Sequence, residues 1–448
     1  MPRGPRNLRI SFDGVGLTSF GGVALLRKFF QHLGIRGQLS RSVRFPQRNN
    51  EYSISEMIES LLHPLILGLG RVETTEPLRN NGVFQYLAGL PGYPAATTLR
   101  RFLRRFARAG LPQFLALHDR WRKEMLSRPK RLKKAILDFD ATVLTVYGKQ
   151  QGSAIGFNPK KRGRPSYMPL LCFEGQTGDV IAGSYQPGNT HPIMAAEQIL
   201  GEVFAKLPGG AGQVRIRGDA AFLGHRFVES VEAKKGYYAI VSKLPKPLRN
   251  KLGGIRYRRV SRGVSAGEFK YQPEGWKNRK RFVVIRRPIP EEPSAQLHLF
   301  QVEGYTYQVF VTNMALKPLN LWRFYNQRST AELIIRELKD AYALGKIPSK
   351  DFAANEAFFH IVLLAYNLLS WFKRLCAPPR WQRATLPTLR QKLLFVPAQF
   401  VRPGGTPTLR IAPGFTRPDD FIDVMKRITK IKPLGDPTAK RRPKRRAK

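Results

Sequence analysis

The spacing of apolar residues changes along the chain, and the change separates a helical first part from a β-rich middle part. Apolar residues recur every three to four positions in 23–33 and 53–69, which predicts amphipathic helices and a mostly helical domain over residues 1–130. From residue 134 the apolar runs become short, at 135–147, 167–173 and 180–185. Three such runs joined by loops predict an antiparallel meander of strands.

The next segment alternates between helix and strand. The pattern predicts helices at 192–206 and 222–234 and strands at 213–219 and 237–242. This is the order of a βαβ unit, so we expect residues 131–243 to form the first part of an α/β core with a mixed sheet. Loops rich in Pro, Gly and Lys and alternating strands then fill residues 244–303, which predicts a β insertion.

The core resumes with a strand at 306–312, so its second part is predicted over residues 304–376. A long helical segment is expected at 319–344 and another at 352–375. The longest apolar run, 357–372, contains His360 and Asn367 and is shorter than the roughly 20 residues of a membrane span, which indicates a core helix and no membrane association. Residues 377–448 are Pro-rich and basic, and we expect little structure there. The expected fold class is therefore multidomain α/β with a helical C-terminal part.

The net charge of the chain limits the classes of partner that it can bind. Of 448 residues 77 are Lys or Arg and 31 are Asp or Glu, which gives a net charge of +46. Such a charge favours a polyanionic partner, with nucleic acid first and an anionic membrane surface or ribosomal RNA second. Two cysteines exclude a disulfide framework, and no apolar stretch of signal-peptide length follows the basic N-terminus. We therefore expect a cytoplasmic protein.

One predicted helix, at 97–109, combines a basic face with an apolar face. At 100° per residue its arginines fall on one arc and its Leu and Phe residues on the opposite arc. The arginines chosen as candidate DNA contacts are Arg101, Arg104 and Arg108. Such a helix can lie along a DNA groove; the alternative is a solvated basic surface over a packed apolar one.

Acidic residues occupy two predicted strands. Asp138 and Asp140 lie on the same face of strand 135–147, because side chains alternate with a period of two. A buried carboxylate is costly unless a cation or hydrogen bonds compensate it, so these are candidates for a site or for a solvated edge strand. Asp219 ends strand 213–219 and precedes a helix, where it can belong to a site or cap that helix.

A third acid comes from the helical segment 319–344. Tyr325, Arg328, Glu332 and Lys339 are spaced by 3, 4 and 7 residues, so on one continuous helix they fall within roughly 60° of arc. Three acids from separate elements can then converge. A set of carboxylates suits Mg²⁺ or Mn²⁺, and two such ions can assist the cleavage of a phosphodiester.

These residues carry a family resemblance. The chain resembles a DDE insertion-sequence transposase of the group with a Y-x2-R-x3-E-x6-K signature, matched by Tyr325, Arg328, Glu332 and Lys339. The segments DFDAT, GFNPKKRGRPSY, QPGNTH, RGDAAF and VTNM also contribute to the similarity, which spans about residues 60–375. The resemblance implies a ribonuclease-H-like catalytic core interrupted by a β insertion. It selects Asp140 over Asp138 and implies Asp140, Asp219 and Glu332 as catalytic and metal-binding residues. It also implies that Tyr325, Arg328 and Lys339 contact DNA phosphates.

A basic loop within this similarity adds candidate DNA contacts. These are Lys160, Lys161, Arg162 and Arg164. A short hairpin that contacts phosphates is the plainer interpretation, and an AT-hook that binds the minor groove is the alternative.

The expected function is that of a DNA transposase that binds, cuts and joins the ends of an insertion sequence. The alternatives are a non-catalytic DNA-binding protein derived from a transposase and a metal-dependent nuclease. We expect a homodimer on double-stranded DNA, associated with the nucleoid in the cytoplasm of a bacterium.

Overall fold

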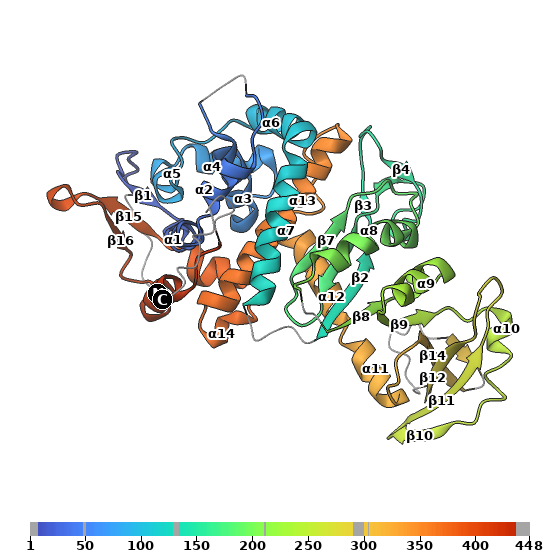
Figure 1. Cartoon of the computed structure of the whole chain (residues 1–448). Helices are drawn as coiled ribbons and strands as arrows, with labels where there is room; N and C mark the ends of the chain where they lie inside the picture. The colour runs from blue at the N-terminus through green and yellow to red at the C-terminus, as the bar shows by residue number, and fades with distance from the viewer. Residues whose placement is uncertain are drawn as a thin grey trace, which may run out of the picture. The chain divides into compact units, whose positions relative to one another are not determined.

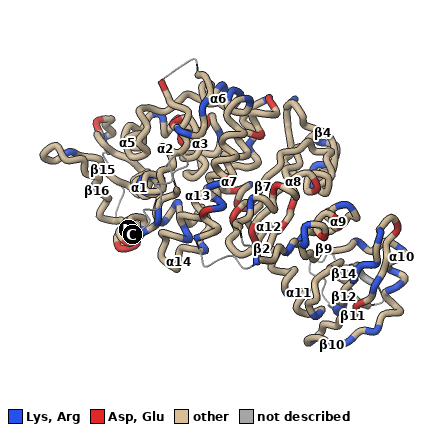
Figure 2. Tube along the Cα trace, viewed as in Figure 1, with Lys and Arg blue, Asp and Glu red and all other residues tan. Residues whose placement is uncertain are grey.

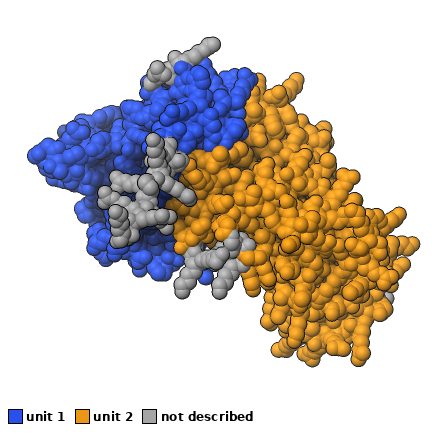
Figure 3. All heavy atoms as spheres, viewed as in Figure 1, with its two compact units in different colours: residues 1–114, 341–348, 368–448 blue, residues 115–340, 349–367 orange. Residues whose placement is uncertain are grey.

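The chain folds into two compact units, each assembled from separate stretches of sequence. The computed structural model describes residues 8–47, 51–128, 134–209, 212–289, 300–302 and 304–435. Unit 1 comprises residues 1–114, 341–348 and 368–448, and unit 2 comprises residues 115–340 and 349–367 (Figure 3). Helices α7 (Leu111–Ser127) and α13 (Phe352–Cys376) each contain residues of both units. The chain therefore passes from one unit to the other inside these helices, and not at the predicted domain boundaries.

Unit 2 is built on a large mixed sheet, so the predicted mixed α/β class is confirmed (Figure 1). The strand order is β10-β11-β12-β14-β9-β8-β2-β6-β7, and β13 also pairs with β14. The strands are β2 (Lys134–Ala141), β6 (Leu170–Glu174), β7 (Val180–Ser184), β8 (Gln213–Gly218), β9 (Tyr237–Ser242), β10 (Arg258–Ser261), β11 (Val264–Tyr271), β12 (Lys280–Pro288), β13 (Phe300–Val302) and β14 (Tyr305–Thr312).

The two strand patterns expected for the core are both present. Strands β2, β6 and β7 form the predicted antiparallel meander. Strands β2, β8 and β9 run parallel, and the connection from β8 to β9 contains a helix, as the βαβ pattern requires. The predicted insertion is not a separate sheet: β12 pairs with β14 along eight residues, so its strands extend the core sheet. Main-chain hydrogen bonds thus connect the insertion directly to the core.

Helices cover both faces of this sheet. Helices α8 (Pro192–Lys206) and α9 (His225–Ala233) pack on one face, in a hydrophobic core shared with Ala135, Leu137 and Phe139 of β2. Helix α11 (Pro318–Asn326) packs on the other face, and α12 (Ser329–Asp340) contacts β2 there. Because side chains alternate along a strand, the even-numbered residues of β2 face α11 and α12. Asp138 and Asp140 are therefore on that face.

Unit 1 is helical in its N-terminal part, as predicted. The helices are α1 (Val23–Leu33), α2 (Ile35–Ser42), α3 (Ile54–Leu67), α4 (Glu76–Arg79), α5 (Gly82–Ala88) and α6 (Ala96–Ala109). Helix α3 begins at a capping box in which Ser53 Oγ accepts the Glu56 N–H and the Glu56 carboxylate accepts the Ser53 N–H. This exchange satisfies two backbone donors at the start of the helix.

The C-terminal region contradicts the expectation of little structure, since much of residues 379–430 is regular. It contains α14 (Pro379–Gln382), α15 (Leu386–Leu389), β15 (Ala398–Val401), β16 (Thr408–Ile411) and α16 (Pro418–Lys430). Strand β15 lies between β16 and β1 (Leu17–Thr18), and α16 packs on α1. The short elements escaped detection because each offers too few periods for a pattern and because their partners lie far away in the sequence. The basic tail 439–448 lies outside the described residues.

Helix α13 is the one helix, among the described residues, with the length and apolar composition of a membrane span. Its most apolar 18-residue window has a mean hydropathy of 1.4, and 83% of that window is buried inside the protein. Burial of this extent is what the predicted core helix requires.

Candidate active site

The two aspartates of β2 have different surroundings. The Asp138 side chain is 1% exposed and pairs with the fully buried Arg217 of β8, whose Nε and Nη2 donate to the two carboxylate oxygens at 2.6 and 2.7 Å. Arg217 also donates to the backbone carbonyl of Phe324 in α11 at 2.6 Å. Asp138 therefore ties two strands and a helix together, and its carboxylate is already compensated.

Asp140 and Asp219 follow one another on neighbouring strands. In the parallel register of β2 and β8, Phe139 lies opposite Gly218, and each aspartate comes directly after that pair. Asp219 begins the 3₁₀ turn η2 (Ala220–Phe222), and its Oδ1 accepts the Ala221 N–H at 2.9 Å. Asp219 thus caps a turn at the end of β8 and also lies at the strand end where Asp140 is found.

The third acid belongs to a helix that is shorter than expected. The predicted single helix over 319–344 is wrong: α11 ends at Asn326, α12 begins at Ser329, and Arg328 lies in the turn between them. The Arg328 N–H donates to Tyr325 O at 2.9 Å, and its carbonyl accepts the Ala331 N–H at 2.9 Å. Tyr325 belongs to α11, whereas Glu332 and Lys339 belong to α12. The angle calculated for one continuous helix therefore does not apply between Tyr325 and the other two residues.

Arg328 contacts two of the three acids. Its Nη2 is 3.1 Å from Asp140 Oδ1, and its Nη1 is 3.1 Å from Glu332 Oε1. It also donates to the backbone carbonyl of Phe139 at 3.3 Å. The side chains of Arg328 and Asp140 are 5% and 13% exposed, whereas that of Glu332 is 62% exposed. One buried guanidinium thus links the strand acid to the helix acid.

The electrostatics of these residues show that the three acids lie near one another. Burial raises the pKa of Asp140 to about 6; Arg328 opposes the shift, and the negative charges of Asp219 and Glu332 add to it. Burial also raises the pKa of Tyr325 to about 12, an effect that Arg328 opposes and the same three acids reinforce. Tyr325, Arg328 and the three acids therefore belong to one charged cluster.

Lys339 interacts electrostatically with Asp140 of this cluster and with Lys160 of the basic loop. Burial and the positive charge of Lys160 lower the pKa of Lys339, while Asp340 and Asp140 oppose the shift. Lys160 belongs to the loop between β4 (Ala154–Ile155) and β5 (Pro165–Tyr167), which form a small sheet with β3 (Leu144–Thr145). Lys339 thus lies near both Asp140 and Lys160, which is far from it in the sequence.

The loop itself is an ordinary hairpin turn. Asn158, buried at 4% exposure, accepts the Lys161 N–H at 3.1 Å and donates to Thr145 Oγ1 at 3.1 Å. Gly163 adopts a φ of 74°, which a residue without a side chain accommodates readily. Lys160, Lys161, Arg162 and Arg164 are all exposed, so their charged groups are available to an anionic partner.

The donor set fits a hard divalent cation, because all three candidate ligands are carboxylates. Among the described residues, however, no three side chains of Asp, Glu, His or Cys are grouped as a metal site in this conformation. Arg328 instead pairs with the carboxylates of Asp140 and Glu332, which are two of the three candidate ligands. The residues therefore have the right chemistry for the ion but require a local adjustment to hold it.

In unit 1, helix α6 presents the predicted two faces. Its buried residues are Leu99, Phe102, Leu103 and Phe106, and Arg101, Arg104, Arg105 and Arg108 are exposed. Figure 2 shows the concentration of basic positions along this helix. Arg100, also on the basic arc, instead pairs with Glu73 and donates to Pro348 O at 3.0 Å. The amphipathic pattern is confirmed, and Arg100 is engaged within the unit.

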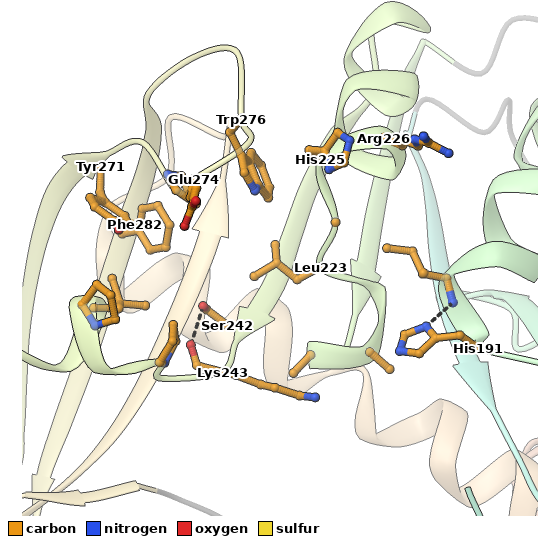
Figure 4. A pocket seen from close by; sticks show the side chains of 18 of the residues that line it. His191, Leu223, His225, Arg226, Ser242, Lys243, Tyr271, Glu274, Trp276 and Phe282 are labelled. Atoms are coloured by element: carbon orange, nitrogen blue, oxygen red, sulfur yellow. Dashed lines mark hydrogen bonds between the residues drawn. The ribbon is translucent and has the colours of Figure 1, made fainter. Parts of the chain in front are cut away.

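A pocket of about 660 Å³ lies between the core and the insertion in unit 2 (Figure 4). Its insertion side carries Tyr271, Trp276 and Phe282, and its core side includes Ala220 and Ala221, next to Asp219. His191 and His225 are also among its lining residues, and His191 caps α8 by accepting the Ile193 N–H. His191 thus has a capping role.

Sequence reasoning missed Arg217. A signal was present, because Arg215 and Arg217 alternate along a strand that leads to an acid, and a buried cation there requires a buried anion on a neighbouring strand. Without the register of β2 against β8, that anion could not be identified as Asp138. Sequence reasoning also missed the proximity of Lys160 to Lys339, because it depends on where the loop between β4 and β5 lies.

Comparison with known proteins identifies a family. The sequence model of the family "Transposase DDE domain group 1" matches residues 2–433. No curated protein matches the chain.

Several solved structures are similar in part. A cryo-EM structure of the piggyBac transposase synaptic complex with hairpin DNA is 13% identical, with a TM-score of 0.39, and the match covers 85% of this chain and 88% of that one. The Mos1 transposase paired-end complex with the left transposon end is 10% identical, with a TM-score of 0.17, over 44% of this chain and 60% of that one. The Mos1 mariner paired-end complex with Mn is 13% identical, with a TM-score of 0.17, over 47% and 65%. The family match, which spans nearly the whole chain, carries the assignment.

Proposed function

Because the chain belongs to the DDE transposase family of domain group 1 and is a DNA transposase, we propose that Asp140, Asp219 and Glu332 are its catalytic carboxylates. The observation that supports this choice is the charged cluster around Arg328. It joins one acid on β2, one at the end of β8 and one on α12, and each acid acts on the pKa of Asp140 or on that of Tyr325. Asp138, the alternative on β2, is already neutralised by Arg217.

DDE transposases use divalent metal ions, and we propose that the three carboxylates hold two ions of Mg²⁺ or Mn²⁺. When bound, such ions activate the attacking oxygen and stabilise the leaving oxygen of a phosphodiester. Strand β2 holds Asp140 in place through its pairing with β6 and β8, so this carboxylate is positioned before DNA arrives. The surrounding sheet is, in this proposal, a ribonuclease-H-like core extended by the insertion strands.

The proposed reaction has two phosphoryl transfers. Water attacks the phosphorus at the transposon end, the P–O3′ bond breaks, and the 3′-oxygen leaves and takes up a proton. The freed 3′-hydroxyl then loses its proton as it attacks a target phosphodiester, and the target 3′-oxygen leaves. In this proposal Tyr325, Arg328 and Lys339 bind the phosphates on either side of the reacting one. Lys160 lies near Lys339, and the exposed residues of its loop add further DNA contacts, namely Lys160, Lys161, Arg162 and Arg164. Arg101, Arg104 and Arg108 of α6 contact the DNA end elsewhere.

The test replaces each acid by its amide. We expect Asp140→Asn, Asp219→Asn and Glu332→Gln each to abolish cleavage of end DNA and to leave its binding within about twofold, because Lys and Arg rather than carboxylates supply the affinity. Gel assays of cleavage and binding measure the two effects. The matched control is Glu337→Gln, the same change on the same helix, which should cleave normally. Normal cleavage by any one of the first three variants would remove that residue from the catalytic set.

Two alternatives make different products. A non-catalytic DNA-binding protein would bind ends and cut nothing, and the three acids, which repel one another, would then have no role. A nuclease would cut without joining. Incubation of pre-cut ends with supercoiled target DNA separates these, because strand transfer converts the circle into a joined product.

We also propose that the protein acts as a homodimer on double-stranded DNA, associated with the nucleoid in a bacterial cytoplasm. The supporting argument is geometric, since one cluster serves one transposon end at a time and transposition joins two ends to one target.

A further inference from the structure

We propose that Arg328 is an internal counter-ion that occupies the metal-binding carboxylates until a DNA phosphate takes it away, so that DNA binding and metal binding strengthen each other. This inference rests on the proposed function, because it takes Asp140 and Glu332 to be metal ligands. Arg328 is then a positioning residue that sets when the ions bind, in addition to contacting DNA.

The contacts of Arg328 support the proposal. Its two terminal nitrogens do not form a bidentate pair with one acid; one goes to Asp140 and the other to Glu332, each at 3.1 Å. The guanidinium thus bridges a strand residue and a helix residue, as an ion held by both carboxylates would have to. A cation in that place makes the approach of a second cation unfavourable.

Burial explains why the pair persists when no DNA is bound. The Asp140 side chain is 13% exposed, so an unpaired carboxylate there would be costly. Among the described residues, Arg328 forms the ion pair with Asp140. The charges of Asp219 and Glu332 increase that cost. Without Arg328 or a metal ion, three carboxylates would repel one another at the end of the sheet.

The backbone around Arg328 allows the side chain to leave. Arg328 lies in the turn between α11 and α12, so no complete helical turn encloses it on both sides. Its Nε has no hydrogen-bond partner, and the Glu332 carboxylate that it contacts is 62% exposed. The guanidinium itself is buried, but its contact with the exposed Glu332 carboxylate gives the cluster one open side. A phosphate can approach from that side and offer two oxygens in the geometry that arginine prefers.

The coupling follows from thermodynamics. If DNA draws Arg328 away from Asp140 and Glu332, the metal no longer has to displace it, and metal affinity rises by some factor; bound metal must then raise DNA affinity by the same factor. The enzyme would thereby hold its ions firmly only when a DNA end is present, which limits cutting in the absence of a substrate.

The test measures metal binding itself. We expect Arg328→Gln to bind Mn²⁺ on the order of tenfold more tightly than the wild type at pH 8 without DNA, measured by electron paramagnetic resonance of free Mn²⁺. The matched control is Arg336→Gln, which removes the same charge from an exposed position on α12 and should leave the affinity unchanged. Added end DNA in which a methylene group replaces the bridging 3′-oxygen at the cut cannot be cleaved there. It should tighten Mn²⁺ binding of the wild type and of Arg336→Gln, but should tighten that of Arg328→Gln much less.

Other outcomes separate the two hypotheses. If Asp140→Asn leaves Mn²⁺ binding unchanged with DNA bound, the proposed metal ligands are wrong. If Asp140→Asn removes binding but Arg328→Gln and the wild type have equal affinity, the ligands are right and the counter-ion role is wrong. Should Arg328→Gln fail to fold by circular dichroism, Arg328→Lys replaces it: a lysine cannot span both carboxylates, so its affinity should exceed that of the wild type, and equal affinity would overturn the proposal.

Discussion

At the scale of single residues, the partner decides the role of an acid more than its position in the sequence does. Asp138 and Asp140 are two residues apart on one face of β2, yet one faces Arg217 and the other faces Arg328. Arg217 is fully buried and also binds a backbone carbonyl, whereas Arg328 lies in a turn beside an exposed glutamate. The first pair is closed to solvent, and the second has an open side at which chemistry with a ligand is feasible.

The raised pKa of Asp140 gives a prediction about stability. In the metal-free folded protein this carboxyl has a pKa of about 6, but in the unfolded chain it ionises near its ordinary value of 3.8. Between these values the folded state binds more protons, so the free energy of unfolding falls as pH rises. Asp140→Asn lacks this decrease. We expect its stability relative to the wild type to increase by about 2 kcal/mol from pH 4 to pH 7, since one unit of pKa corresponds to about 1.4 kcal/mol.

Urea unfolding in EDTA, at both pH values, measures this difference. A relative stability of Asp140→Asn that stays constant with pH would show that the carboxyl ionises normally. Excess Mg²⁺ should reduce the effect, because a metal ion favours the ionised carboxylate.

At the scale of elements, regular patterns were predictable and interruptions were not. Helices α1 and α8 and strand β9 occupy the ranges that the apolar periodicity indicated. The break between α11 and α12 was missed, because residues 326–329 contain neither Gly nor Pro and apolar residues recur at helical spacing on both sides of them. The acids of the site could be selected from their motif, but their pairing with Arg217 and Arg328 depends on strand register and on that break.

Helix α6 offers a prediction about DNA binding. We expect a triple variant of the full-length protein to show a smaller slope of log K against log salt, where K is the affinity for DNA. The variant changes Arg101, Arg104 and Arg108 to Ala, and the slope should fall by about 0.9 for each DNA phosphate that these side chains neutralise. Arg100→Ala is the control, because Glu73 and a backbone carbonyl already engage that guanidinium, and its slope should equal that of the wild type. Fluorescence anisotropy with end DNA at several salt concentrations gives the slopes. If the triple variant keeps the wild-type slope, the basic face of α6 is a solvated surface.

Helix α16 tests whether the C-terminal region belongs to the fold of unit 1. Ile428 is fully buried and Ile422 is 50% exposed on the same helix. We expect Ile428→Ala to lower the free energy of unfolding by about 2–5 kcal/mol and Ile422→Ala by less than about 1 kcal/mol. Chemical unfolding of the two variants, which carry the same change, measures the difference. Equal small effects would mean that the helix contributes little to unit 1.

At the scale of the whole molecule, the charge of +46 is spread over the folded body, because the predicted basic tail accounts for seven of the 77 basic residues. Non-specific attraction to DNA is therefore expected over much of the surface, and binding should weaken steeply with salt. Specific recognition of ends has to come from particular groups, such as those on α6 and in the loop 160–164, acting on top of this attraction.

The proposed homodimer gives a prediction about mass. Light scattering of the full-length protein with paired end duplexes should show two protein copies for two ends, since each end needs its own set of Asp140, Asp219 and Glu332. The protein alone and the protein with a duplex of unrelated sequence are the comparisons. A stable complex of one copy with two captured ends would exclude the paired arrangement.

The pairing of β1 with β15 sets a schedule for the synthesis of the protein. Thr18 lies opposite Ala398, so 380 residues must be added after β1 has been made before its partner exists. At roughly 5–20 residues per second this takes on the order of 20–80 s. During this time α16, which packs on α1 in the folded protein, has also not been made. Unit 2 ends at residue 367, so all of its residues are made before β15. Unit 2 can therefore fold while unit 1 still lacks β15 and α16.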